Sequence, residues 1–127
     1  MVQHDSTERR TRRSDDTITA LHYQLAYARH HGGYEAVVLV DASGTLVAGA
    51  GAWPLCEELA AYAPLLDRPD GVRAPLRGPV QLQRLSIAGV NVLLAARGPA
   101  NDNGGAAIDG AATGCRRILT GRSANVA

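Results

Sequence analysis

The chain has 127 residues, the usual length of one compact domain, and 46% of them are apolar. The core has to be built mainly from aliphatic side chains, because there is no Phe and only one Trp. The formal net charge of +1 gives no electrostatic argument for nucleic acid as a partner. No apolar run approaches the roughly 20 residues of a membrane span, and the polar start is unlike a secretory signal. We therefore expect a cytoplasmic protein that does not insert into a membrane.

Residues 1–15 have almost no apolar side chain after Val2, which predicts a disordered leader. Acidic residues balance its arginines, so a solvated leader is the simpler interpretation, and a basic arm that docks on an acidic partner is the alternative. The arginines are Arg9, Arg10, Arg12 and Arg13.

Helical spacing begins near Thr17, and the Gly32–Gly33 pair is typical of a helix end. The predicted helix face consists of Ile18, Leu21, His22, Leu25 and Arg29.

The stretch from Glu35 to Ala52 predicts a strand, a tight turn and a second strand. Its run Val37–Val40 is continuously apolar, which is typical of a central strand covered on both faces. Asp41 and Gly44 are the residue types that such a turn needs, and Thr45–Ala50 forms the returning strand.

A second helix is predicted to start at Trp53–Pro54, because proline fits the first turn of a helix. Pro64 removes a backbone donor, which predicts an end or a kink near residues 60–63. The apolar stripe of this helix consists of Leu55, Leu59, Tyr62 and Leu66.

Residues 67–79 are rich in Pro, Gly and Arg and predict a connection, with a short strand at residues 72–76 inside it. Val80–Arg97 predicts a second hairpin that turns at Ala88–Gly89. The apolar residues change parity along its first strand, so we expect a bulge or a bend of the strand near Gln83–Arg84.

The last helix is expected over Ala106–Thr120, with Gly121 as its end and residues 122–127 as a tail. One domain then spans residues 16–121. Short links and hairpins favour an antiparallel sheet with helices on both faces, an α/β (α+β) fold.

No P-loop, GxSxG, HExxH or GxGxxG motif is present, so we predict no catalytic residues and no cofactor. The Gly-rich turn at residues 49–54 favours a tight strand-to-helix link over an anion site. His22, His30 and His31 lack the spacing of metal ligands on a helix, so no metal site is predicted. Cys56 and Cys115 lie in apolar surroundings, which indicates buried thiols in a reducing compartment.

The 35–52 unit, with its apolar strand, Asp-x-x-Gly turn and small-residue second strand leading into a helix, resembles the Roadblock/LC7 domain. The final apolar hairpin and the closing helix support this resemblance, which covers roughly residues 16–120. It implies a five-stranded sheet in the order α-β-β-α-β-β-β-α, with the second helix on one face and the other two on the opposite face. It also implies a homodimer and a non-catalytic role as a regulator or scaffold of small Ras-like GTPases.

The expected interface combines the second helix with the suspected edge strand. For Trp53 a core anchor is the alternative to an interface residue, and for the three arginines a solvated edge is the alternative. The expected interface residues are Trp53, Leu55, Leu59, Tyr62, Leu66, Arg73, Arg77 and Arg84.

A second hypothesis comes from another functional class, a GAF-like sensor that binds a small molecule between sheet and helices. Such a protein needs a pocket, for which Trp53, Tyr62 and the 67–79 connection are the candidate lining. A concave apolar pocket would favour the sensor, and a filled core would favour the interaction module. An enzyme is the third possibility, and the sequence offers it no set of acid, base and nucleophile.

Overall fold

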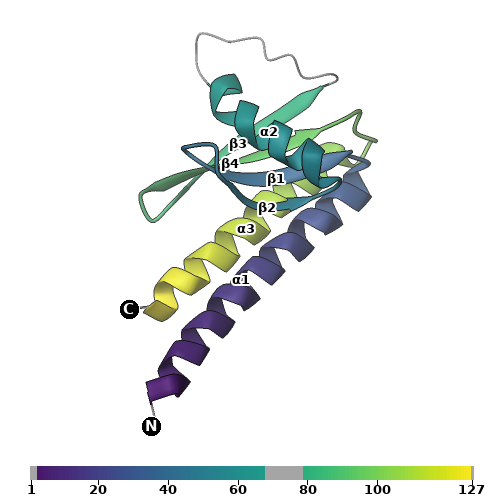
Figure 1. Cartoon of the computed structure of the whole chain (residues 1–127). Helices are drawn as coiled ribbons and strands as arrows, with labels where there is room; N and C mark the ends of the chain where they lie inside the picture. The colour runs from purple at the N-terminus through teal and green to yellow at the C-terminus, as the bar shows by residue number, and fades with distance from the viewer. Residues whose placement is uncertain (1–2, 68–78, 127) are drawn as a thin grey trace.

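The computed structural model describes the backbone of residues 3–67 and 79–126, and the side chains of residues 15–67 and 79–121. Three helices and four strands follow one another along this part of the chain (Figure 1). They are α1 (Gln3–Gly32), β1 (Ala36–Asp41), β2 (Leu46–Ala50), α2 (Trp53–Leu66), β3 (Val80–Ile87), β4 (Val90–Arg97) and α3 (Gly104–Val126).

The strands form one antiparallel sheet in the order β2-β1-β4-β3. β1 and β4 lie at its centre, in agreement with their continuous apolar sequences. The described residues contain four strands where five were expected, so the predicted order does not hold as stated. The additional strand was predicted at residues 72–76, which lie outside the described residues.

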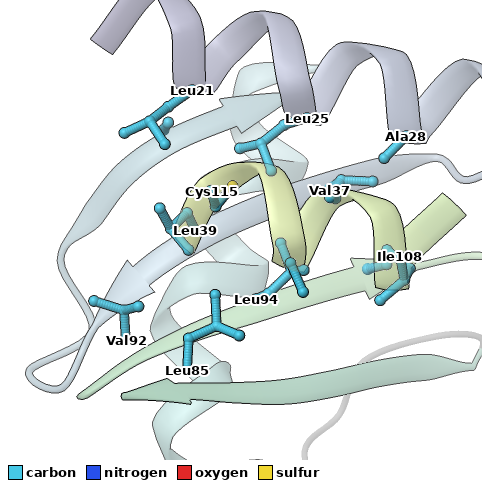
Figure 2. Packing of buried hydrophobic residues seen from close by; sticks show 14 of the residues in the cluster. Leu21, Leu25, Ala28, Val37, Leu39, Leu85, Val92, Leu94, Ile108 and Cys115 are labelled. Atoms are coloured by element: carbon cyan, nitrogen blue, oxygen red, sulfur yellow. The ribbon is translucent and has the colours of Figure 1, made fainter. Parts of the chain in front are cut away.

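Helices cover both faces of the sheet, as the two apolar strands predicted. α1 and α3 lie side by side on one face and α2 lies on the other (Figure 1). Alternate residues of each central strand therefore enter two separate cores. Figure 2 shows the first core, a single cluster that contains Leu21 and Leu25 of α1, Ile108 and Cys115 of α3, and Leu39 of β1.

The second core lies between the sheet and α2. Helix α2 contributes Cys56, Leu59, Ala60 and Ala63, all of them buried. Small side chains at three of these positions allow the helix to approach the sheet closely.

The predicted bulge near Gln83–Arg84 is wrong, because β3 pairs with β4 without a break from Val80 to Ile87. The parity change has another cause, which is that both faces of β3 carry apolar contacts. Val80 and Leu82 pack against the α2 core, whereas Leu85 and Ile87 enter the other one. The irregular register lies instead between β1 and β2, at Leu39/Val40.

The predicted start of the first helix is also wrong, because α1 begins at Gln3 and not near Thr17. Residues 3–15, expected as a disordered leader, have helical backbone. A helix without an apolar stripe gives no periodic signal, which is why the sequence pattern did not indicate it. The end of α1 at Gly32, followed by Gly33 with a φ of +72°, agrees with the prediction.

Helix α2 does not end near residues 60–63, because it continues through Pro64 to Leu66. The Asp67 N–H donates to the Ala63 carbonyl at 3.1 Å, so the last turn closes without a donor from Pro64. The burial of Ala63 and the half-burial of Leu66 favour this turn.

Helix α3 begins at Gly104, slightly before the predicted start, and continues past Gly121 to Val126. Gly121 does not adopt the left-handed conformation that ends a helix, so it does not stop this one. Both hairpin turns were placed correctly: Gly44 has a φ of +91°, and Ala88 and Gly89 have φ values of +52° and +80°. Two successive positive φ values define the tight turn that suits a two-residue hairpin.

Candidate interaction surface

The residues of the predicted apolar stripe on α2 lie in two different environments. Leu59 has no exposed surface and belongs to the α2 core. Leu55, Tyr62 and Leu66 are each half-buried. Leu59 thus supports this helix from beneath, and the other three are the members of the stripe that retain accessible surface.

The three half-buried residues lie on the flank of α2 that is turned toward β4 and β3. Two contacts fix this orientation. Glu58 lies 3.7 Å from the Arg97 guanidinium of β4. On the opposite flank, Pro64 lies beside Gly44, in the turn between β1 and β2. With 100° per residue, Leu55, Tyr62 and Leu66 fall on the side of Glu58 and away from Pro64.

Strand β3 extends this apolar flank. Val80 and Leu82 are half-buried and pack against the α2 core, as does Leu55. β3 is also an outer strand of the described sheet. An outer strand carries backbone groups that a further strand or another chain can pair with. We call Leu55, Tyr62, Leu66, Val80 and Leu82 the α2–β3 flank.

Trp53 is half exposed at the first position of α2, with 50% of its surface accessible. Its interpretation as a core anchor is therefore wrong. A Trp side chain exposed on a helix end is available to a partner, because tryptophan is enriched among the residues that dominate interfaces. The exposed position also does not suit a lining residue of a closed sensor pocket.

Arg84 joins β3 to the end of α2. Its guanidinium donates to the Asp67 carboxylate at 2.6 Å, and its own side chain is 58% exposed. An exposed ion pair adds little stability, so its main effect is to fix how the end of α2 lies over β3. The predicted interface residues Arg73 and Arg77 lie outside the described residues.

Arg97 is a buried charged residue that the sequence analysis did not single out. Its side chain lies between two carboxylates, Glu58 of α2 at 3.7 Å and Glu35 ahead of β1 at 4.0 Å. The guanidinium therefore connects the second turn of α2 to the start of β1 and to the end of β4. The available signal was an arginine that terminates a run of apolar strand residues.

The Gly-rich turn before α2 forms a tight link, as predicted. Gly51 has a φ of +120°, and a Cβ atom at this position would lie 2.6 Å from the Glu35 carbonyl oxygen. Ala52 caps α2 without a side-chain hydrogen bond, and Pro54 occupies the first turn. The close approach of backbone to backbone explains why this turn needs glycine.

His22 lies at the open edge of β2. Its Nδ1 atom is 2.8 Å from the Gly49 carbonyl oxygen and 3.3 Å from the Gly49 backbone nitrogen. The N–H and C=O of one residue in an antiparallel strand point to the same edge of that strand. β2 pairs with β1 along one edge, and the Gly49 groups point to the opposite, outer edge. His22 thereby covers an edge position that would otherwise be unpaired, a role that helical spacing alone did not indicate.

The remaining candidate residues take structural positions. His30 and His31 are exposed at the end of α1. Within the described part of the chain, no three metal-ligating side chains gather into a candidate metal site. Cys56 and Cys115 are buried free thiols, as expected. Burial raises the pKa of the Cys115 thiol to about 11, which keeps it protonated and unreactive.

Comparisons with known proteins identify the fold. No protein-family model matches the sequence, and no curated protein matches it. Among solved structures, the chain is similar to Myxococcus xanthus MglB, with a TM-score of 0.53 and 16% identity. The similarity covers 87% of this chain and 92% of that chain. The fold is therefore Roadblock-like, as the sequence resemblance indicated. None of the described helices combines the length and apolarity that a membrane span requires.

Proposed function

We propose that this chain is a non-catalytic, cytoplasmic interaction module that forms a homodimer and regulates or scaffolds a small Ras-like GTPase. The observation that carries the proposal is the layered arrangement of α2, the antiparallel sheet and the α1/α3 pair. This arrangement resembles MglB over most of both chains. The resemblance of the sequence to the Roadblock/LC7 domain implies a regulator or scaffold of small Ras-like GTPases.

The α2–β3 flank is the proposed dimer surface. Its side chains are apolar and only half-buried in the single chain, so association would remove further apolar area from water. The outer strand β3 runs beside it and offers backbone groups for pairing across the interface. Arg84 extends the same surface at the end of α2, where it pairs with Asp67. Trp53 falls on the other flank of the helix, close to the direction of Pro64, and is exposed there.

Solution mass across a dilution series tests the dimer, since one chain has a mass of 13.3 kDa. We expect the wild type to reach at least twice this mass and Tyr62→Glu to stay folded and reach a lower mass than the wild type at the same concentration. Ala61→Glu is the matched control, because Ala61 is exposed on the neighbouring position of the same helix. A wild type that remains monomeric at every concentration, or a Tyr62→Glu variant whose mass follows that of the wild type at every concentration, would contradict the proposal.

Binding to purified Ras-like GTPases tests the regulatory role. Each GTPase is loaded with GDP or with a non-hydrolysable GTP analogue, and binding is followed by calorimetry. We expect one nucleotide state to bind more tightly, because the switch loops of a GTPase differ between the two states. If the dimer forms normally but no GTPase binds, or each binds equally in its two nucleotide states, regulation of the tested GTPases is excluded. The role as a dimeric scaffold would then remain.

A further inference from the structure

The outward face of α1 carries two large aromatic side chains that are mostly exposed. Tyr23 is 74% exposed and Tyr27 is 55% exposed. The buried residues of the same helix, Leu21, Leu25 and Ala28, face the sheet and α3. With 100° per residue, Tyr23 and Tyr27 lie on the opposite side of the helix. Two exposed tyrosines on successive turns form a patch, in contrast to isolated apolar residues that are normal on any surface.

The third member of this patch is His31, one turn further on. The Tyr27 and His31 rings lie 3.9 Å apart between centroids. Stacking restricts both side chains before any partner arrives, which lowers the entropy lost on binding. Because Tyr and Trp side chains dominate the energetics of many interfaces, an ordered aromatic row of this kind is suited to a protein partner.

The ends of the patch are chemically complementary to each other. Asp15 and Asp16 are exposed at one end, and His30 and His31 are exposed at the other. An α-helix rises 1.5 Å per residue. Along the axis of α1, Asp16 and His31 therefore each lie about 11 Å from the midpoint between residues 23 and 24, on opposite sides of it. A two-fold axis through that midpoint would bring the carboxylate of one helix to the imidazole N–H of another, antiparallel helix.

The same two-fold axis would also allow the two helices to pack closely against each other. It places Tyr27 of one helix opposite Ala20 of the other, where a small, half-buried side chain leaves room for the ring. Large residues that pack over small ones are what closely approaching helices need. The antiparallel orientation also places the helix dipoles favourably.

From these observations we propose that α1 is a second self-association surface, which binds α1 of another copy in antiparallel orientation. Tyr23 and Tyr27 form the centre of this contact, and Asp16–His31 pairs close its two ends. The surface lies on the opposite side of the molecule from α2 (Figure 1). A chain with two different two-fold contacts on opposite faces assembles beyond the dimer into linear arrays.

The first test is the solution mass of wild type, Tyr27→Glu, Tyr62→Glu and the combined variant. Tyr27 is exposed, so its replacement removes the contact without disturbing the core. We expect Tyr27→Glu to raise the dissociation constant of the α1 contact at least about tenfold, as is usual for a central aromatic residue. In the Tyr62→Glu background, where only the α1 contact remains, adding Tyr27→Glu should then give monomers.

The outcomes separate this proposal from the dimer proposed above. If Tyr27→Glu changes no mass in either background, the α1 contact does not exist, whatever Tyr62→Glu does. If the wild-type dimer depends on Tyr27 and ignores Tyr62, the α1 contact stands and the α2–β3 dimer fails. A wild type that stays monomeric up to millimolar concentration overturns both.

A charge exchange tests the antiparallel register. Asp16→Lys should weaken association, and Asp16→Lys combined with His31→Glu should restore most of it. The two positions are about 22 Å apart along one helix, so a restoration has to come from contacts between copies. A double variant that associates more weakly than Asp16→Lys alone would overturn the proposed register.

Discussion

Two glycines hold the backbone of Glu35 between them. A Cβ atom at Gly51 would lie 2.6 Å from the Glu35 carbonyl oxygen, and a Cβ atom at Gly98 would lie 3.0 Å from the Glu35 nitrogen. Both glycines have a φ near +120°. This clamp fixes where the chain enters β1, and it also positions the carboxylate that faces Arg97.

Gly51→Ala should therefore destabilise the fold by about 2 kcal/mol or more, because it combines a backbone clash with a strained φ. Gly110→Ala is the control. Gly110 is helical with open space at its Cβ position, so alanine there should raise stability by about 0.5–1 kcal/mol. Urea unfolding measures both. Equal effects of the two substitutions would show that the clamp does not constrain the turn.

Asp41 controls the turn between β1 and β2 through its charge. Its Oδ1 atom accepts hydrogen bonds from the Ser43 hydroxyl, the Ser43 N–H and the Thr45 N–H. The Ser43 hydroxyl contributes most to lowering the pKa of Asp41 below its ordinary value of 3.8, and the backbone donors add to it. A carboxylate with a lowered pKa stabilises the folded state above its unfolded pKa, and this contribution disappears as the pH falls through the folded value.

We expect the free energy of unfolding of the wild type to fall as the pH is lowered from about 5 to 3, more steeply than that of Asp41→Asn. The asparagine keeps an oxygen acceptor and removes the titration. Urea unfolding at pH 7, 4 and 3 measures the difference. Parallel pH profiles for the two proteins would rule out Asp41 as a source of acid sensitivity.

At the scale of the elements, α2 is held by a small number of buried side chains over the sheet. Leu59→Ala should lower the free energy of unfolding by about 3 kcal/mol, because it leaves a cavity in a core whose other members are mostly small. Leu55→Ala is the matched control and should cost about 1 kcal/mol, since Leu55 is half-buried. Similar costs for the two leucines would mean that α2 does not pack on the sheet as described.

The contact between α1 and the edge of β2 concerns two elements that are far apart in sequence. His22→Ala should cost about 1 kcal/mol of stability, the usual net value of a hydrogen bond, and should expose the Gly49 backbone groups. Exposed edge groups favour strand pairing between molecules. Light scattering on heating should thus show earlier aggregation for His22→Ala than for His30→Ala, whose parent residue is exposed on the same helix. Identical aggregation would contradict the role of His22 at the edge.

At the scale of the whole molecule, the sequence predicted what depends on local patterns. Continuous apolar runs located β1 and β4, and turn residues such as Asp41 and Gly44 located the hairpins. The sequence reasoning was wrong where tertiary contacts decide. The parity change in β3 reflects a strand covered on both faces, and α2 passes Pro64 because its last turn is closed by Asp67.

The candidate surfaces were less predictable for the same reason. A helical stripe identifies Leu55, Leu59, Tyr62 and Leu66 as a group, but only the sheet determines that Leu59 is buried and the others are half-buried. Tyr23 and Tyr27 carried no signal, because an aromatic residue on the outward side of a helix breaks no pattern. Arg97 and His22 act through partners that are distant in sequence, which a local reading does not include.

The antiparallel course of α1 and α3 has a practical consequence. Both described helices extend to the same end of the molecule, while α2 lies on the far side of the sheet (Figure 1). A tether attached to either helix end would hold the protein in the same orientation, with the α2–β3 flank directed away from the support. Surface-immobilised binding assays should accordingly give the same result whichever of the two ends carries the handle, and a reporter at one end would sense a reporter at the other.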